Sequence, residues 1–175
     1  MLQGRWEEEI QHGVLNDHFV EVEKIPQSKV YRGFAIEARE LKQSGVRLKI
    51  SADLLIDRGE WYELVECRGW NHPASDTGTA LGQALVYRQL MEMNDKYPAG
   101  VKKPVKLGLC FVDGFNTEYG RWTSAADRLV AALAGSIKQE LKVYLVRPRQ
   151  PEFAEEKHWF VSANYCVDPQ VKVFK

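Results

Sequence analysis

Apolar and polar residues alternate with a period of two from Val46 to Asp57, a pattern typical of a β-strand. The apolar positions fall on one face of this strand: Val46, Leu48, Ile50, Ala52, Leu54 and Ile56. Residues Asp57 to Glu60 have the composition of a turn, and the segment from Trp61 to Gly69 then alternates again. The pattern predicts two neighbouring strands joined by a short turn.

Helical spacing of apolar residues predicts two helices before this hairpin. The first covers about residues 5–16 and is marked by Trp6, Ile10 and Val14. The following residues 18–25 fit either a strand or an extension of that helix, which Pro26 ends in both cases. The second helix ends at Gly45, where a C′ glycine is expected, and its apolar stripe consists of Tyr31, Phe34, Ala38 and Leu41.

Two further helices are predicted after the hairpin. One runs from Asp76, a plausible N-cap, to about Asp95. The other begins at the capping pattern formed by Ser124 and Asp127. Its apolar stripe consists of Ala125, Leu129, Leu133, Ile137 and Leu141.

Nearly continuous apolar runs mark the remaining strands. Residues 105–113 read as a buried central strand, and residues 142–148 form another strand that Pro148 stops. A last apolar run covers about residues 159–167. The order of elements predicts an α/β fold with a mixed central sheet flanked by helices on both faces, in one domain over residues 1–175.

Composition narrows the class of protein. Of 175 residues 45% are hydrophobic and 27% charged, and the 24 basic residues balance the 24 acidic ones, as in an ordinary globular chain. Residues 101–150 hold 9 basic and 4 acidic side chains, which predicts either a local basic face or an ordinary solvated surface. The chain has no apolar run of membrane-spanning length, and three scattered cysteines fit a reducing compartment. We therefore expect a cytoplasmic protein without membrane contact.

Three charged residues interrupt the apolar hairpin: Asp53 on the first strand, and Glu66 and Arg68 on the second. Two carboxylates close together in a partly buried site repel each other unless a cation lies between them or one stays protonated. Oxygen ligands favour Mg²⁺ or Mn²⁺, which activate water and stabilise charge on a phosphate. The alternative is an ion-pair cluster on an exposed sheet face.

The spacing of these residues resembles a known nuclease motif. Asp53, followed after twelve residues by Glu66-Cys67-Arg68, is similar to the PD-(D/E)xK motif of the restriction-endonuclease-like nucleases. On the next helix, Gln83 and Tyr87 resemble the QxxxY motif of RecB-type exonucleases. The resemblance covers about residues 30–148, with N- and C-terminal additions. It implies a restriction-endonuclease-like fold and metal-dependent hydrolysis of DNA.

The resemblance also assigns expected roles. Asp53 and Glu66 would bind Mg²⁺ or Mn²⁺, Arg68 would bind the phosphate, and Gln83 and Tyr87 would support them. Family members often carry a further acidic residue on a preceding helix. Glu37 flanks the predicted apolar stripe at about 80° from its centre and is the better third ligand than Glu40, at about 140°.

This chain departs from the motif where the family has lysine. Arginine stays protonated in proteins, so Arg68 could stabilise a phosphate but could not act as a base. Lys49, on the same predicted strand face as Asp53, could supply an amine instead.

A competing hypothesis is a catalytically inactive domain that binds nucleic acid or serves assembly. In either case the expected partner is DNA, through the basic residues of 101–150, and a homodimer or a partner subunit stays open. If the trio is a metal site, Asp53→Ala should leave stability unchanged or raise it, because carboxylate repulsion is relieved.

Overall fold

A computed structural model describes residues 11–38, 41, 43–45, 50–68, 73–112, 122–148 and 166–175. Its centre is a six-stranded mixed sheet whose spatial order follows the chain, β1-β2-β3-β4-β5-β6. The strands are β1 Val30–Ile36, β2 Ile50–Asp57, β3 Tyr62–Arg68, β4 Val105–Val112, β5 Leu141–Pro148 and β6 Cys166–Phe174. The pairs β3–β4 and β4–β5 are parallel, whereas the other neighbours are antiparallel.

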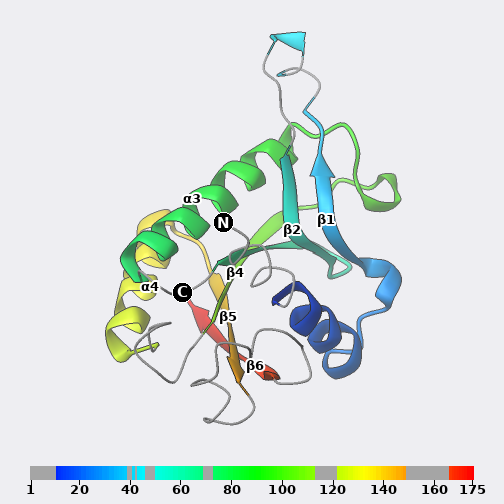
Figure 1. The fold of residues 1–175 in the computed structure, drawn as a ribbon. Helices are drawn as coiled ribbons and strands as arrows, with labels where there is room; N and C mark the ends of the chain where they lie inside the picture. The colour runs from blue at the N-terminus through cyan, green and yellow to red at the C-terminus, as the bar shows by residue number, and fades with distance from the viewer. Residues whose placement is uncertain are drawn as a thin grey trace.

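Helices cover both faces of the sheet, as predicted (Figure 1). On one face lie α3, Pro73–Glu92, and α4, Ser124–Ile137. On the other lies a helix over residues 11–17, called the N-terminal helix below, which the π-helical turn η1, His18–Val22, extends. Short 3₁₀ turns, η2 (Gln27–Lys29) and η3 (Pro98–Gly100), precede β1 and β4. No helix in the described ranges is long and apolar enough to cross a membrane.

The alternation of β3 sorts its side chains between two cores. Tyr62 and Leu64 are buried beneath α3 and α4, whereas Val65 and Cys67 are buried beneath the N-terminal helix. This division confirms the two faces predicted for β3. The glutamate at position 66 follows Leu64 on the side of α3, which places the candidate carboxylate beneath that helix.

The predicted helix before the hairpin is wrong over most of its length. Residues Val30–Ile36 instead form β1, which pairs antiparallel with β2 at the edge of the sheet. Gly33 has φ 61°, which a helix interior does not accept. Tyr31 and Phe34 are three residues apart, which is also the spacing of an apolar stripe on a helix. In the strand their rings pack against each other with centroids 5.9 Å apart. Gly45 has the positive φ expected of a C′ glycine.

The two helices predicted after the hairpin are present, but their first residues, caps and buried faces differ from the prediction. Helix α3 begins at Pro73, so Asp76 lies in its first turn and is not the N-cap. Helix α4 is capped by Thr123, whose hydroxyl accepts a hydrogen bond from the Ala126 backbone N–H. The buried residues of α4 are Ala126, Val130 and Ala134, about 100° around the helix from the predicted stripe.

The buried strands agree with the sequence analysis. β4 and β5 lie in the interior of the sheet, which explains their continuous apolar sequences. Leu141 is the first residue of β5 and does not belong to α4. Of residues 18–25, the first five extend the first helix as the π-helical turn η1, which is one of the two predicted alternatives, whereas residues 23–25 belong to neither a helix nor a strand. The last strand, β6, begins near the end of the apolar run at 159–167, and residues 159–165 of that run lie outside the described residues.

Candidate metal and phosphate site

Strands β2 and β3 pair regularly from the hairpin turn up to Leu54 and Val65. Beyond that pair, side chains take over the hydrogen bonding. The Asp53 backbone N–H donates to Glu66 Oε1 at 3.4 Å, and the Cys67 backbone N–H donates to Asp53 Oδ2 at 2.7 Å. This exchange places the carboxylates of both predicted metal ligands where the two strands separate.

The regular alternation of β2 breaks at the same place. Ala52 belongs to the core under α3 and α4, whereas Leu54, two residues later, belongs to the core under the N-terminal helix. The sequence pattern places both on one face, and that expectation is wrong. Because the strand turns over at Asp53, its carboxylate contacts His12 on the N-terminal helix and also acts electrostatically on Tyr87 of α3.

Helix α3 contributes the two residues predicted from its sequence motif. The Arg68 guanidinium donates a hydrogen bond to Gln83 Oε1. One turn later, burial raises the pKa of Tyr87, and the charges of Glu66 and Asp53 raise it further, whereas Arg68 opposes them. Gln83 and Tyr87 therefore face the charged trio. The glycine before Gln83 is exposed, and a Cβ added there would meet no atom within 4 Å, so it does not mark a close approach of helix to sheet.

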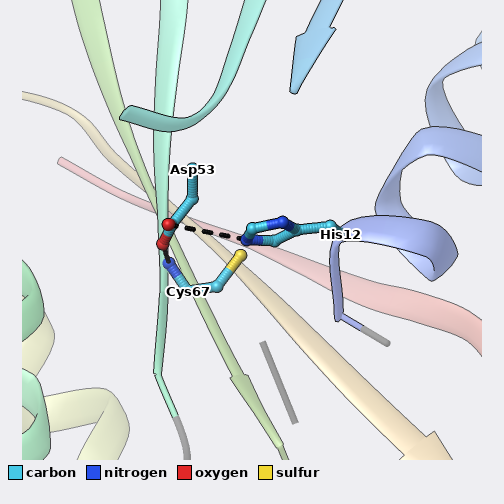
Figure 2. Close-up of side chains that lie close together, drawn as sticks. All are labelled: His12, Asp53 and Cys67. Atoms are coloured by element: carbon cyan, nitrogen blue, oxygen red, sulfur yellow. Dashed lines mark hydrogen bonds and ion pairs between the residues drawn. The ribbon is translucent and has the colours of Figure 1, made fainter. Parts of the chain in front are cut away.

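His12, on the N-terminal helix, joins the site although the sequence analysis missed it. Its Nε2 lies 3.5 Å from Asp53 Oδ1 and is buried without a well-formed hydrogen bond. Figure 2 shows the imidazole edge directed toward the Asp53 carboxylate and the Cys67 sulfur directed toward that imidazole edge. A sequence signal existed: His12 shares a helix face, at i+3 and i+7, with the buried Leu15 and Phe19.

The electrostatics of His12 follow from these neighbours. Burial lowers the pKa of the imidazole, but its interactions with Asp53 and with the Cys67 thiol outweigh burial and raise the pKa to about 10. The ring is therefore cationic at neutral pH and acts as counter-ion to Asp53. The preceding residue anchors the helix, because Gln11 Nε2 donates to the Arg68 backbone carbonyl at 2.8 Å.

The donor atoms fit a divalent ion. Within the described ranges, His12, Asp53 and Cys67 each offer a ligand atom within 4.8 Å of the others. Two atoms that each bind one ion at about 2.0–2.1 Å lie roughly 3.0–3.5 Å apart. The 3.5 Å between His12 Nε2 and Asp53 Oδ1 matches that separation.

Glu37 does not join the site. It follows β1 directly, its side chain is 52% exposed, and its carboxylate pairs with Lys96 Nζ at 3.1 Å. The β1–β2 register pairs Arg32 with Leu54 and Phe34 with Ala52, which puts the position opposite Asp53 at residue 33. Glu37 is therefore four residues, or about 13 Å, further along the chain. The expectation failed because it assumed a helix here. Glu40 and Lys49 lie outside the described residues.

Other charged residues of the hairpin belong to a separate buried network under the N-terminal helix. Glu63, 2% exposed, accepts hydrogen bonds from Arg58 Nε at 2.7 Å and from the Tyr144 hydroxyl. Arg58 also pairs with Glu23, whose other oxygen meets His18 Nε2 at 3.0 Å. These groups stabilise the fold and are distinct from the candidate site.

The basic residues of 101–150 are partly neutralised inside the molecule. Lys103 Nζ lies 2.6 Å from Asp57, a buried residue at the end of β2. Lys102 pairs with Glu92 at 3.3 Å, and Lys142 approaches Glu63 at 3.6 Å. A basic face for DNA in this region therefore stays a prediction.

Comparison of the chain with protein-family models, with curated proteins and with solved structures found no match.

Proposed function

We propose that this chain is a metal-dependent nuclease of the PD-(D/E)xK type, with a restriction-endonuclease-like fold, that hydrolyses phosphodiester bonds of DNA. The observation that carries the proposal is the meeting of Asp53 and Glu66 where β2 and β3 separate. On the face of the sheet that α3 covers, Arg68 donates a hydrogen bond to Gln83. If these carboxylates served only to hold β2 and β3 together, there would be no reason for both to lie where the pairing of the two strands ends.

Asp53 would hold Mg²⁺ or Mn²⁺ between the two faces of the sheet, with Glu66 from the α3 side or His12 from the side of the N-terminal helix. The ion would lower the pKa of a bound water and offset charge on the phosphate. The role of His12 is an addition to the ligands predicted from sequence, and Glu37 is no longer among them. Since the imidazole is cationic without metal, it must lose its proton to become a ligand.

The remaining residues act on the phosphate. Arg68 offers a guanidinium that can bind two phosphate oxygens, and its hydrogen bond to Gln83 fixes its direction. The raised pKa of Tyr87 keeps its hydroxyl protonated at neutral pH, so it can donate a hydrogen bond to a phosphate oxygen. Neither group can serve as general base, so the nucleophile would be a water whose pKa the metal ion lowers and whose proton passes to the solvent.

The principal experiment is cleavage of plasmid and of single-stranded DNA with Mg²⁺, with Mn²⁺ and with EDTA. We expect metal-dependent cleavage by the wild type and a loss of at least about 10²-fold in Asp53→Asn and in Glu66→Gln. Glu37→Gln is the matched control, because this exposed carboxylate pairs with Lys96 away from the site. Cleavage that survives both site variants would contradict the assignment.

The second candidate is an inactive nucleic-acid-binding or assembly module. It is favoured by the arginine at position 68, where the resembled motif has lysine. Arg68→Lys separates the candidates. A wild type that binds DNA but never cleaves it, together with a cleaving Arg68→Lys variant, would identify a nuclease that has lost its activity. Failure of both proteins to cleave DNA would leave the binding module.

A further inference from the structure

The ligand cluster contains a thiol that a magnesium site does not need. Cys67 is fully buried, and its sulfur lies within 4.8 Å of ligand atoms of His12 and Asp53. The residue sits between Glu66 and Arg68 on β3, but its side chain points to the opposite face, under the N-terminal helix. In Figure 2 the sulfur lies beside the imidazole edge that faces Asp53.

The combination of donors selects a class of metal. Mg²⁺ takes oxygen ligands and water, whereas imidazole and thiolate suit Zn²⁺, Co²⁺ and other ions of intermediate softness. A bound metal deprotonates a coordinating thiol. Thiolate and Asp53 together then supply two negative charges for a divalent ion, with neutral His12 as the third ligand and a fourth position for water.

An independent observation supports a ligand at this place. His12 Nε2 is buried, and its contact with Asp53 Oδ1 at 3.5 Å is too long for a well-formed hydrogen bond, although buried polar atoms almost always have one. A metal between this nitrogen, the Asp53 carboxylate and the sulfur would replace that long contact with direct bonds.

We propose that His12, Asp53 and Cys67 form a site for a divalent transition metal of the Zn²⁺ and Co²⁺ class, with the Cys67 sulfur as a direct ligand. The inference rests on the proposed function and replaces its Mg²⁺ or Mn²⁺ with an ion of this class, bound through the same Asp53 carboxylate. It goes beyond that function because a thiolate ligand would make the site prefer these ions over Mg²⁺.

The test is a titration of the whole chain with Co²⁺, read by absorption spectroscopy without DNA. A thiolate ligand gives a strong near-ultraviolet charge-transfer band. We expect this band in the wild type and its loss in Cys67→Ser, with Co²⁺ affinity reduced more than about tenfold. Cys110→Ser is the matched control: Cys110 is also fully buried, lies opposite Cys67 in the β3–β4 register and is hydrogen-bonded to its thiol, but it is not in the ligand cluster, and serine keeps a hydrogen-bonding group there. It should keep the band.

A second measurement covers the case in which Cys67→Ser does not fold. X-ray absorption on the Zn²⁺ or Co²⁺ form of the wild type should show metal–sulfur scattering at about 2.3 Å. Scattering from nitrogen and oxygen alone, or a band that persists in Cys67→Ser, would overturn the inference while leaving the nuclease proposal intact. Conversely, a thiolate band in a protein that cleaves no DNA with any metal would retain the metal site and refute the nuclease.

Discussion

At the scale of single residues, Asp53 is both a candidate metal ligand and a hydrogen-bond acceptor that holds β2 to β3, and the two roles compete for the same carboxylate oxygens. As a candidate metal ligand it needs a free oxygen, yet Oδ2 accepts the Cys67 backbone N–H and Oδ1 faces His12. The carboxylate therefore also replaces a ladder hydrogen bond where β2 and β3 part. Removal of its side chain must affect the fold as well as any chemistry.

This double task reverses the effect on stability that the sequence predicts for Asp53→Ala. The alanine leaves the buried Cys67 N–H without its acceptor and the His12 cation without its counter-ion. We expect a loss of about 1–3 kcal/mol in the free energy of unfolding. Asp53→Asn keeps an acceptor oxygen and should lose less. Urea unfolding at pH 7 without metal measures both, and an alanine variant as stable as the wild type would show that repulsion from Glu66 dominates.

At the scale of elements, the sequence predicts correctly those strands that are buried along their whole length or that alternate regularly between two faces. β4 and β5 are interior strands, so their continuous apolar sequences identified them. β1 is an edge strand with few buried residues, and the spacing of its aromatic side chains fitted a helix equally well. The positions of Glu66 and Arg68 followed from the alternation of one strand. The helical spacing of His12 indicated a buried position, but its contact with Asp53 joins segments about forty residues apart, which no local pattern contains.

The N-terminal helix is held on the sheet by a charge network whose effect depends on pH. Burial alone raises the pKa of Glu23, but hydrogen bonds from His18 and Arg58 outweigh burial and lower it to about 2 from 4.5. Because the folded pKa is the lower one, the stabilisation is complete above about pH 4.5 and is lost as the pH falls toward 2.

We therefore expect Glu23→Gln to be less stable than the wild type at pH 7. The difference should be about 1–2 kcal/mol, less than the full pKa shift implies, because solvent partly screens this carboxylate. It should shrink between pH 4.5 and pH 2, where the wild-type carboxylate becomes protonated, and urea unfolding across this range measures it. Glu92→Gln is the control, because Glu92 makes an exposed pair with Lys102 that contributes little. A difference independent of pH would contradict a role for the Glu23 charge.

At the scale of the whole molecule, the candidate site joins three parts of the chain across the sheet. The N-terminal helix brings His12, the β2–β3 hairpin brings the carboxylates, and α3 brings Gln83 and Tyr87. Gln11 ties the first part to the end of β3. A ligand that binds His12 and Asp53 together would therefore link the helix on one side of the sheet to the hairpin, and stabilise the native state.

Metal binding should thus raise the melting temperature, and the rise should depend on His12. A ligand at about 100 times its Kd stabilises the native state by about 2.7 kcal/mol, which corresponds to about 5–10 °C for a chain of this size. We expect such a rise with Mn²⁺ or Co²⁺ in the wild type and a much smaller one in His12→Gln. His18→Gln is the matched control. His18 is also a buried histidine on this helical segment, but its side chain forms a hydrogen bond with Glu23 and not with Asp53. Equal rises in the two variants would exclude His12 as a ligand, and the absence of any rise in the wild type would argue against a metal site at the hairpin.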